Sequence, residues 1–81
     1  MIKVLAVDDD PHLLETILLQ IEQEGGYDID GAASLTEAKT KLPQMDLDLV
    51  ILDVTLGDGD GRDICRWMRD MGYTIPVLML T

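Results

Sequence analysis

Leu49-Val50-Ile51-Leu52-Asp53 is the stretch that decides the fold, because four consecutive apolar residues lead directly into one carboxylate. A glycine-rich turn, residues 54–61 (VTLGDGDG), follows it. A strand that is apolar on both faces is typical of the middle of a parallel sheet, where helices cover it from both sides. Ligands bind such sheets just beyond the carboxyl ends of the strands, so we expect Asp53 to lie in a surface site.

The overall composition narrows the class of protein. The chain has 81 residues, 47% of them hydrophobic, and a net charge of -10. We therefore expect one small folded domain, residues 1–81. So much negative charge repels phosphate groups, which disfavours nucleic acid and anionic membranes as direct partners. A metal ion or a basic partner could neutralise the excess carboxylates, or the carboxylates could simply form a solvated acidic surface.

Cysteine content and hydropathy indicate the compartment. The single cysteine, Cys65, excludes an intramolecular disulfide, and we expect it to be a small buried hydrophobe. No apolar run reaches the length of a membrane span, and the N-terminus does not resemble a signal peptide. The sequence therefore predicts a cytoplasmic domain.

The first third of the chain predicts a strand, a helix and a strand. Residues 2–7 (IKVLAV) read as a buried strand that ends at Asp8-Asp9-Asp10. Asp10 followed by Pro11 is a typical helix start, and apolar residues then recur with helical spacing until Gly25-Gly26. Residues 27–33 predict a second, weaker strand.

Two more helices and two more strands follow. Ser34 to Glu37 forms a capping box, and we expect Pro43 to close the helix that it starts. The strand around residues 48–53 comes next. Helical spacing then returns in a segment that Gly72 ends, and residues 75–80 form a fourth apolar strand. The residues that carry this last helical spacing are Ile64, Trp67, Met68 and Met71.

This βαβαβαβ order predicts an α/β fold, a doubly wound parallel sheet with right-handed crossovers. Three of the four strands end in polar groups, Asp8-Asp9, Asp53 and Thr81. In a parallel sheet these three ends lie on the same edge. The sequence therefore places several carboxylates and a hydroxyl together.

Carboxylates crowded in this way favour a bound cation. Neighbouring strands lie about 4.8 Å apart, so the acids would repel one another and one would be protonated unless a cation lay between them. Mg²⁺ is the hard divalent ion that suits oxygen ligands and retained water. The alternative is that Asp8 to Asp10 only cap the first helix, a role that we assign to Asp10 in either case.

With such a metal, a carboxylate on the central strand can attack a phosphoryl group and form an acyl phosphate. The metal would neutralise charge on the phosphoryl oxygens, and a nearby hydroxyl could donate a hydrogen bond to one of them. Thr81 stands where that hydroxyl would be needed.

Four segments together resemble the receiver domain of two-component response regulators. They are residues 7–11 (VDDDP), Leu52-Asp53, residues 56–61 and residues 76–81. The resemblance covers the whole chain in the right order and spacing. It implies a flavodoxin-like or receiver-like sheet with strand order 2-1-3-4.

The resemblance also implies a role for each site residue. Asp53 would be the phosphoacceptor, and Thr81 the switch hydroxyl. Asp8, Asp9 and Asp53 would hold Mg²⁺, with Asp9 in more direct contact than Asp8, and the backbone carbonyl of Thr55 would be a further ligand. The phosphodonor would be a sensor histidine kinase or a phosphotransfer protein, and the domain would phosphorylate itself rather than turn over a substrate.

The chain departs from the family in two places. It has Gly57 where the family usually has proline. Receivers similar to it also have a further helix, strand and helix, with a lysine at the end of the fifth strand. We therefore expect a receiver truncated after its fourth strand, or a fragment of a longer protein. The open apolar edge of the fourth strand would then lead to a homodimer or to segment exchange.

Other functions stay open. The fold could serve as an interaction module that is not phosphorylated. A Mg²⁺-dependent phosphatase with an aspartate nucleophile would need a second acid two residues after Asp53, where the chain has Thr55. A calcium loop would need a glutamate eleven residues after Asp58, where the chain has Arg69, so the acids of that turn read better as turn residues and a helix cap. We expect His12 to be an exposed helical residue. Four residues are expected in the core or in helix packing: Trp67, Met68, Met71 and Met79.

Overall fold

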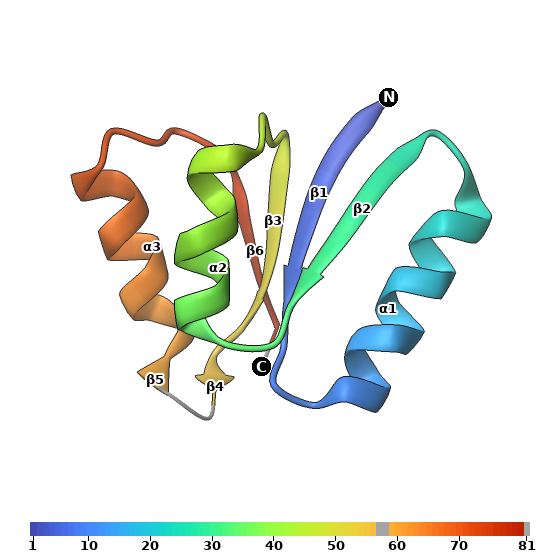
Figure 1. Ribbon diagram of the computed structural model, residues 1–81, viewed down its shortest axis with the longest axis horizontal. Helices are drawn as coiled ribbons and strands as arrows, with labels where there is room; N and C mark the ends of the chain where they lie inside the picture. Colours follow the sequence, from blue (N-terminus) through green and yellow to red (C-terminus); the bar gives the residue numbers. More distant parts are fainter. Residues whose placement is uncertain (57–58, 81) are drawn as a thin grey trace.

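The computed structural model describes residues 1–56 and 59–80, so Gly57, Asp58 and Thr81 lie outside the described residues. Figure 1 shows a sheet between two layers, with helix α1 (Pro11–Glu24) on one face and helices α2 (Leu35–Lys41) and α3 (Gly61–Asp70) on the other. The elements in order are β1 (Ile2–Val7), α1 (Pro11–Glu24), β2 (Tyr27–Ala32), α2 (Leu35–Lys41), the 3-10 helix η1 (Leu42–Gln44), β3 (Leu49–Asp53), β4 (Thr55–Leu56), β5 (Gly59–Asp60), α3 (Gly61–Asp70) and β6 (Val77–Leu80). No helix within the described ranges has the length and apolar character needed to cross a membrane.

The main sheet is parallel and has the order β2-β1-β3-β6. The fourth strand expected from the sequence is β6, so the predicted α/β fold and the order 2-1-3-4 are confirmed. The register pairs Leu52 of β3 with Val7 of β1 and with Met79 of β6. Strand β3 is therefore central, and its last residue, Asp53, lies beside the end of β1.

The segment after β3 differs from the prediction. We expected a glycine-rich loop, but Thr55–Leu56 and Gly59–Asp60 pair as a short antiparallel hairpin. Strands of two residues are too short to show alternation, and glycine and aspartate disfavour strands, so no pattern signalled the hairpin. The described residues form six strands rather than four, and this count does not support the expected truncation, which stays a prediction.

Some element ends also differ from the prediction. Pro43 does not end the chain's helical course, because α2 passes into η1 with Pro43 in the first turn of the 3-10 helix. A proline fits there because an N–H in the first turn has no helical acceptor. Strand β2 ends at Ala32, one residue early, and β6 begins at Val77 rather than at Ile75.

The predicted helix caps are confirmed. Asp10 accepts hydrogen bonds from the first turn of α1, at 3.0 and 3.3 Å. Ser34 accepts the N–H of Glu37 at 3.0 Å, and Asp60 caps α3 by accepting the N–H of Arg62 at 2.8 Å. Each cap satisfies donors that a helix start leaves unpaired, so these three residues fix where the helices begin.

The core lies on both faces of the sheet, as a strand apolar on both sides requires. Ile51 of β3 faces the α1 layer, whereas Leu52, which is fully buried, faces the α2 and α3 layer. Met68 of α3 is also fully buried, in the same core cluster as Leu52, as predicted. The expectation for Met71 is wrong, because this residue follows the last residue of α3 and is 60% exposed.

The outer part of the α3 layer contains two of the three aromatic residues, Trp67 and Tyr73. Trp67 and Tyr73 pack partly against the core, with ring centroids 6.0 Å apart, and Lys39 of α2 places its ammonium 5.9 Å from the Trp67 ring. Met79 and Cys65 also contact this layer and are partly buried, so Cys65 is less buried than predicted. Arg69 donates to the carbonyl oxygen of Tyr73 at 3.0 Å and holds the turn after α3.

The two edges of the sheet differ in charge. Strand β2 carries Asp28 and Asp30, whereas β6 and the segment from Gly72 to Pro76 before it carry no charged residue. On β6 the side chains of Leu78 and Leu80 are 53% and 37% exposed. Charge is one of the features that keep an edge strand from pairing with other chains, and only the β2 edge has it.

Candidate functional site

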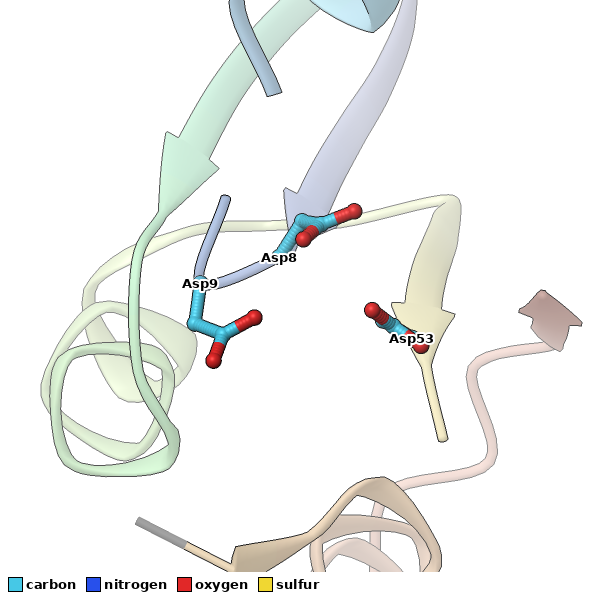
Figure 2. A group of neighbouring side chains, drawn as sticks. All are labelled: Asp8, Asp9 and Asp53. Carbon is cyan, nitrogen blue, oxygen red and sulfur yellow. The ribbon is translucent and has the colours of Figure 1, made fainter. Parts of the chain in front are cut away.

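Three carboxylates meet where β1 and β3 end. Asp8 and Asp9 directly follow β1, and Asp53 is the last residue of β3. One oxygen of each carboxylate lies within 4.8 Å of the corresponding oxygens of the other two, and Figure 2 shows the three side chains around a common space. We call Asp8, Asp9 and Asp53 the acidic cluster. The parallel sheet thus brings together the acids that the sequence placed on one edge.

The three acids differ in their surroundings. Asp8 is 2% exposed, and one of its carboxylate oxygens accepts the N–H of Asp10 at 2.9 Å. The N–H of Asp8 donates to the carbonyl oxygen of Ala32 at 3.0 Å, which ties the end of β1 to β2. Asp9 is exposed and Asp53 is half-buried. The cluster therefore has one buried, hydrogen-bonded member and two members that are partly or fully exposed.

The electrostatics of the cluster favour a cation. Burial raises the pKa of the Asp8 carboxyl above its usual range, and the negative charges of Asp53 and Asp9 raise it further. The hydrogen bond from the Asp10 N–H acts in the opposite direction but does not cancel the effect. A cation among the three carboxylates would relieve this repulsion.

The donor set fits Mg²⁺. This ion binds six oxygens in an octahedron at about 2.0–2.1 Å, so two oxygens on one ion lie roughly 3–4 Å apart. The oxygens of the acidic cluster are at most 4.8 Å apart, a spacing that small side-chain rotations or a retained water would close. Within residues 1–56 and 59–80, no second group of three acidic, histidine or cysteine side chains lies this close together.

Backbone hydrogen bonds fix the end of β3 on two sides. The N–H of Val54 donates to the carbonyl oxygen of Leu80 in β6 at 3.1 Å. The N–H of Gly61, the first residue of α3, donates to the carbonyl oxygen of Val54 at 2.6 Å. The acid at the end of β3 therefore stands on a backbone that is held by both the sheet and a helix.

The remaining predicted site residues are less well placed. The backbone of Thr55 pairs with Asp60 in the β4–β5 hairpin, and its role as a carbonyl ligand stays a prediction. Thr81 lies outside the described residues, so its role also stays a prediction. His12 is exposed in the first turn of α1, as expected. Gly61 is the residue that sequence reasoning overlooked, although it ends the glycine-rich turn.

Comparison with solved structures identifies similar folds. The response regulator MaeR bound to beryllium trifluoride has a TM-score of 0.92 and 32% identity, and the match covers 100% of this chain and 67% of that one. The response regulator TrrA from Thermotoga maritima, in complex with Mg²⁺ and BeF, has a TM-score of 0.85 and 32% identity over 98% of this chain and 70% of that one.

Comparison with curated proteins finds longer relatives. The alkaline phosphatase synthesis transcriptional regulatory protein PhoP of Bacillus subtilis is 36% identical, and the match covers 98% of this chain and 32% of that protein. A probable transcriptional regulatory protein of Picosynechococcus is 36% identical over 98% of this chain and 34% of that protein. The chain therefore spans about a third of the length of these relatives.

The family model described as the response regulator receiver domain matches residues 4–81. A receiver is a phosphoacceptor domain of two-component signal transduction rather than a turnover enzyme, so the match does not support the phosphatase alternative. The acidic cluster at the end of β1 and β3 is consistent with an aspartate phosphoacceptor. On its fold, its acidic cluster and this match, the chain belongs to the response regulator receiver domain family.

Proposed function

We propose that Asp53 accepts a phosphoryl group from a phosphohistidine of a sensor histidine kinase or a phosphotransfer protein, in a reaction that depends on Mg²⁺. The observation that carries the proposal is the acidic cluster, in which the oxygens of Asp8, Asp9 and Asp53 lie within 4.8 Å of one another. Asp53 is the member on the central strand, and it is half-buried rather than sealed from solvent.

Each residue then has a distinct task. A carboxylate oxygen of Asp53 attacks the phosphorus, the new O–P bond forms, and the P–N bond to the donor imidazole breaks. The electron pair of that bond stays on the imidazole nitrogen, which takes up a proton. Thr81 would donate a hydrogen bond to a phosphoryl oxygen.

The metal site would be built by the other acids. Asp9, which is exposed, would contact Mg²⁺ more directly than the buried Asp8, and Asp53 and the carbonyl of Thr55 would complete the protein ligands. Bound Mg²⁺ would supply neutralisation of the charge on the phosphoryl oxygens. The similar structure of TrrA holds Mg²⁺ with BeF, which supports the same metal here.

Intact mass after incubation with a small acyl phosphate and Mg²⁺ tests the proposal. We expect one added phosphoryl group on the wild type, and none on Asp53→Asn or when a chelator removes the metal. Asp63→Asn, which removes an exposed acid from the first turn of α3, is the matched control and should gain the same mass as the wild type. A folded wild type that gains no mass would favour the interaction module instead.

We also propose that the β6 edge pairs with a second copy of the chain. Two copies repel each other through a charge of -10 each, so close approach is easiest where charge is absent, and β6 is the uncharged edge. Identical strands can pair about a two-fold axis and shield Leu78 and Leu80.

Light scattering across a range of protein concentrations tests this pairing. Leu78→Lys should shift the protein towards monomer, because it places a charge on the exposed face of the edge. Leu19→Lys, at a 50% exposed position on α1, should leave the oligomeric state unchanged. A wild type that stays monomeric at every concentration would rule the pairing out.

A further inference from the structure

We infer that Gly61 is a positioning residue for Asp53, because its lack of a side chain lets α3 begin directly against the backbone of the proposed phosphoacceptor. Gly61 is buried at the first position of α3, whereas Asp53 ends β3 eight residues earlier. The inference rests on the function proposed for Asp53. It adds a residue that touches neither the metal nor the phosphoryl group.

The contact between the two backbones leaves no room for a side chain. A Cβ atom on Gly61 would lie 2.0 Å from the carbonyl oxygen of Asp53 and 3.0 Å from its carbonyl carbon. It would also lie 3.2 Å from Cγ of Leu52. Real Cβ atoms essentially never come closer than 3.0 Å to a heavy atom of another part of the chain, so alanine would force the two segments about 1 Å apart.

Space, rather than backbone conformation, is what requires glycine here. The described glycines with positive φ are Gly25, Gly26, Gly59 and Gly72, and Gly61 is not among them. Position 61 therefore does not require the left-handed backbone conformation that favours glycine. A substitution there acts through the clash with Asp53 and not through a strained φ.

The displaced backbone would carry the Asp53 carboxylate with it. The clashing atom is the backbone carbonyl oxygen of Asp53, so the displaced backbone and the carboxylate belong to the same residue. Alanine cannot simply lift α3 away from the strand, because the Gly61 N–H is hydrogen-bonded to the Val54 carbonyl oxygen, so part of the displacement falls on the backbone at Asp53. Metal–ligand distances are defined to within about 0.2 Å, so a backbone shift of about 1 Å would weaken the ligation of a cation by Asp53.

Gly61→Ala tests the inference, with Gly31→Ala as its matched control. A Cβ on Gly31 in β2 would also be crowded, at 3.2 Å from Leu14 and 3.3 Å from Leu18, but by the ends of flexible side chains on the α1 face. We would measure Mg²⁺ affinity by titration calorimetry, and the phosphorylation rate with acyl phosphate per folded molecule. A misplacement of about 1 Å predicts a rate about 10²-fold lower and weaker Mg²⁺ binding for Gly61→Ala. Gly31→Ala should match the wild type in both, even if it unfolds at a lower temperature.

The outcomes separate the inference from the proposed function. A folded Gly61→Ala protein with wild-type Mg²⁺ affinity and rate overturns the inference. If the wild type takes up no phosphoryl group, the proposed function fails, and Mg²⁺ affinity still tests Gly61. Amide hydrogen exchange of the wild type covers the case in which the variant does not fold. The Gly61 N–H donates a hydrogen bond to the Val54 carbonyl oxygen at 2.6 Å and should therefore be strongly protected from exchange. Fast exchange of this amide would overturn the inference.

Discussion

Replacing Asp8 by asparagine should stabilise the protein in the absence of divalent cations and remove its stabilisation by Mg²⁺. Asparagine has nearly the same shape and keeps the oxygen that accepts the Asp10 N–H at 2.9 Å. It removes only the charge that is buried beside Asp9 and Asp53. The substitution therefore isolates the electrostatic cost of the acidic cluster.

The size of this cost follows from the geometry. Two unit charges about 4.8 Å apart repel by roughly 0.9 kcal/mol in bulk water and roughly 3.5 kcal/mol at an effective dielectric constant of 20. Asp9 is exposed and its charge is screened, so we expect the lower half of this range, about 1–2 kcal/mol. In a domain of this size, each kcal/mol raises Tm by about 4–8 °C.

The pH dependence has a definite sign. Burial and the neighbouring charges raise the pKa of Asp8 in the folded state, so its ionised form destabilises the fold at neutral pH. This destabilisation is complete above the raised pKa and disappears as the pH falls below the usual value of 3.8. The advantage of Asp8→Asn over the wild type should therefore be largest near neutral pH and vanish in acid.

Thermal unfolding in chelator and in saturating Mg²⁺ measures both effects. In chelator Asp8→Asn should melt above the wild type, whereas Mg²⁺ should raise the Tm of the wild type and leave the variant nearly unchanged. Asp46→Asn, which removes an exposed charge at the other end of β3, should change Tm little in either condition. Equal or lower Tm for Asp8→Asn in chelator would refute the electrostatic reasoning.

Two further predictions concern stability. Met68→Ala should lower the free energy of unfolding, measured with denaturant, by about 2–5 kcal/mol because Met68 is fully buried. Met71→Ala, at a 60% exposed site, should stay within about 0.5 kcal/mol of the wild type. Similar losses for both variants would contradict the assigned burial. The hydrogen bond from the Ala33 N–H and the neighbouring Lys41 lower the pKa of Glu37. Because the Glu37 side chain is 43% exposed, Glu37→Gln should lower the free energy of unfolding by less than about 1 kcal/mol at neutral pH. This difference in stability between variant and wild type should disappear as the pH falls through the lowered pKa. A difference that grew in acid would contradict this assignment.

Most of the fold could be predicted because it is encoded in short-range patterns. The apolar spacing of α1, the caps at Asp10 and Ser34, and the apolar run of β3 each act within one element. The β4–β5 hairpin could not be predicted in this way, since two-residue strands carry no periodicity. Met71 was misassigned because helical spacing continues in the sequence past the residue where α3 ends.

In the site, too, some features could be predicted from the sequence and others could not. The meeting of Asp8, Asp9 and Asp53 follows from one topological rule, that parallel strands end on the same edge. The burial of Asp8 and the contact of Gly61 with Asp53 depend on how closely separate segments approach, to within a few tenths of an ångström. No spacing of residue types contains that information.

The pair of Trp67 and Tyr73 gives the protein an optical reporter that is confined to one layer. Trp67 is the only tryptophan of the chain, and its ring centroid lies 6.0 Å from that of Tyr73 in the same layer. The other tyrosine, Tyr27, belongs to β2 at the far edge of the sheet. Tryptophan emission therefore reports the loosening of α3 and the turn that follows it, and a partial unfolding confined to α1 would leave that emission unchanged.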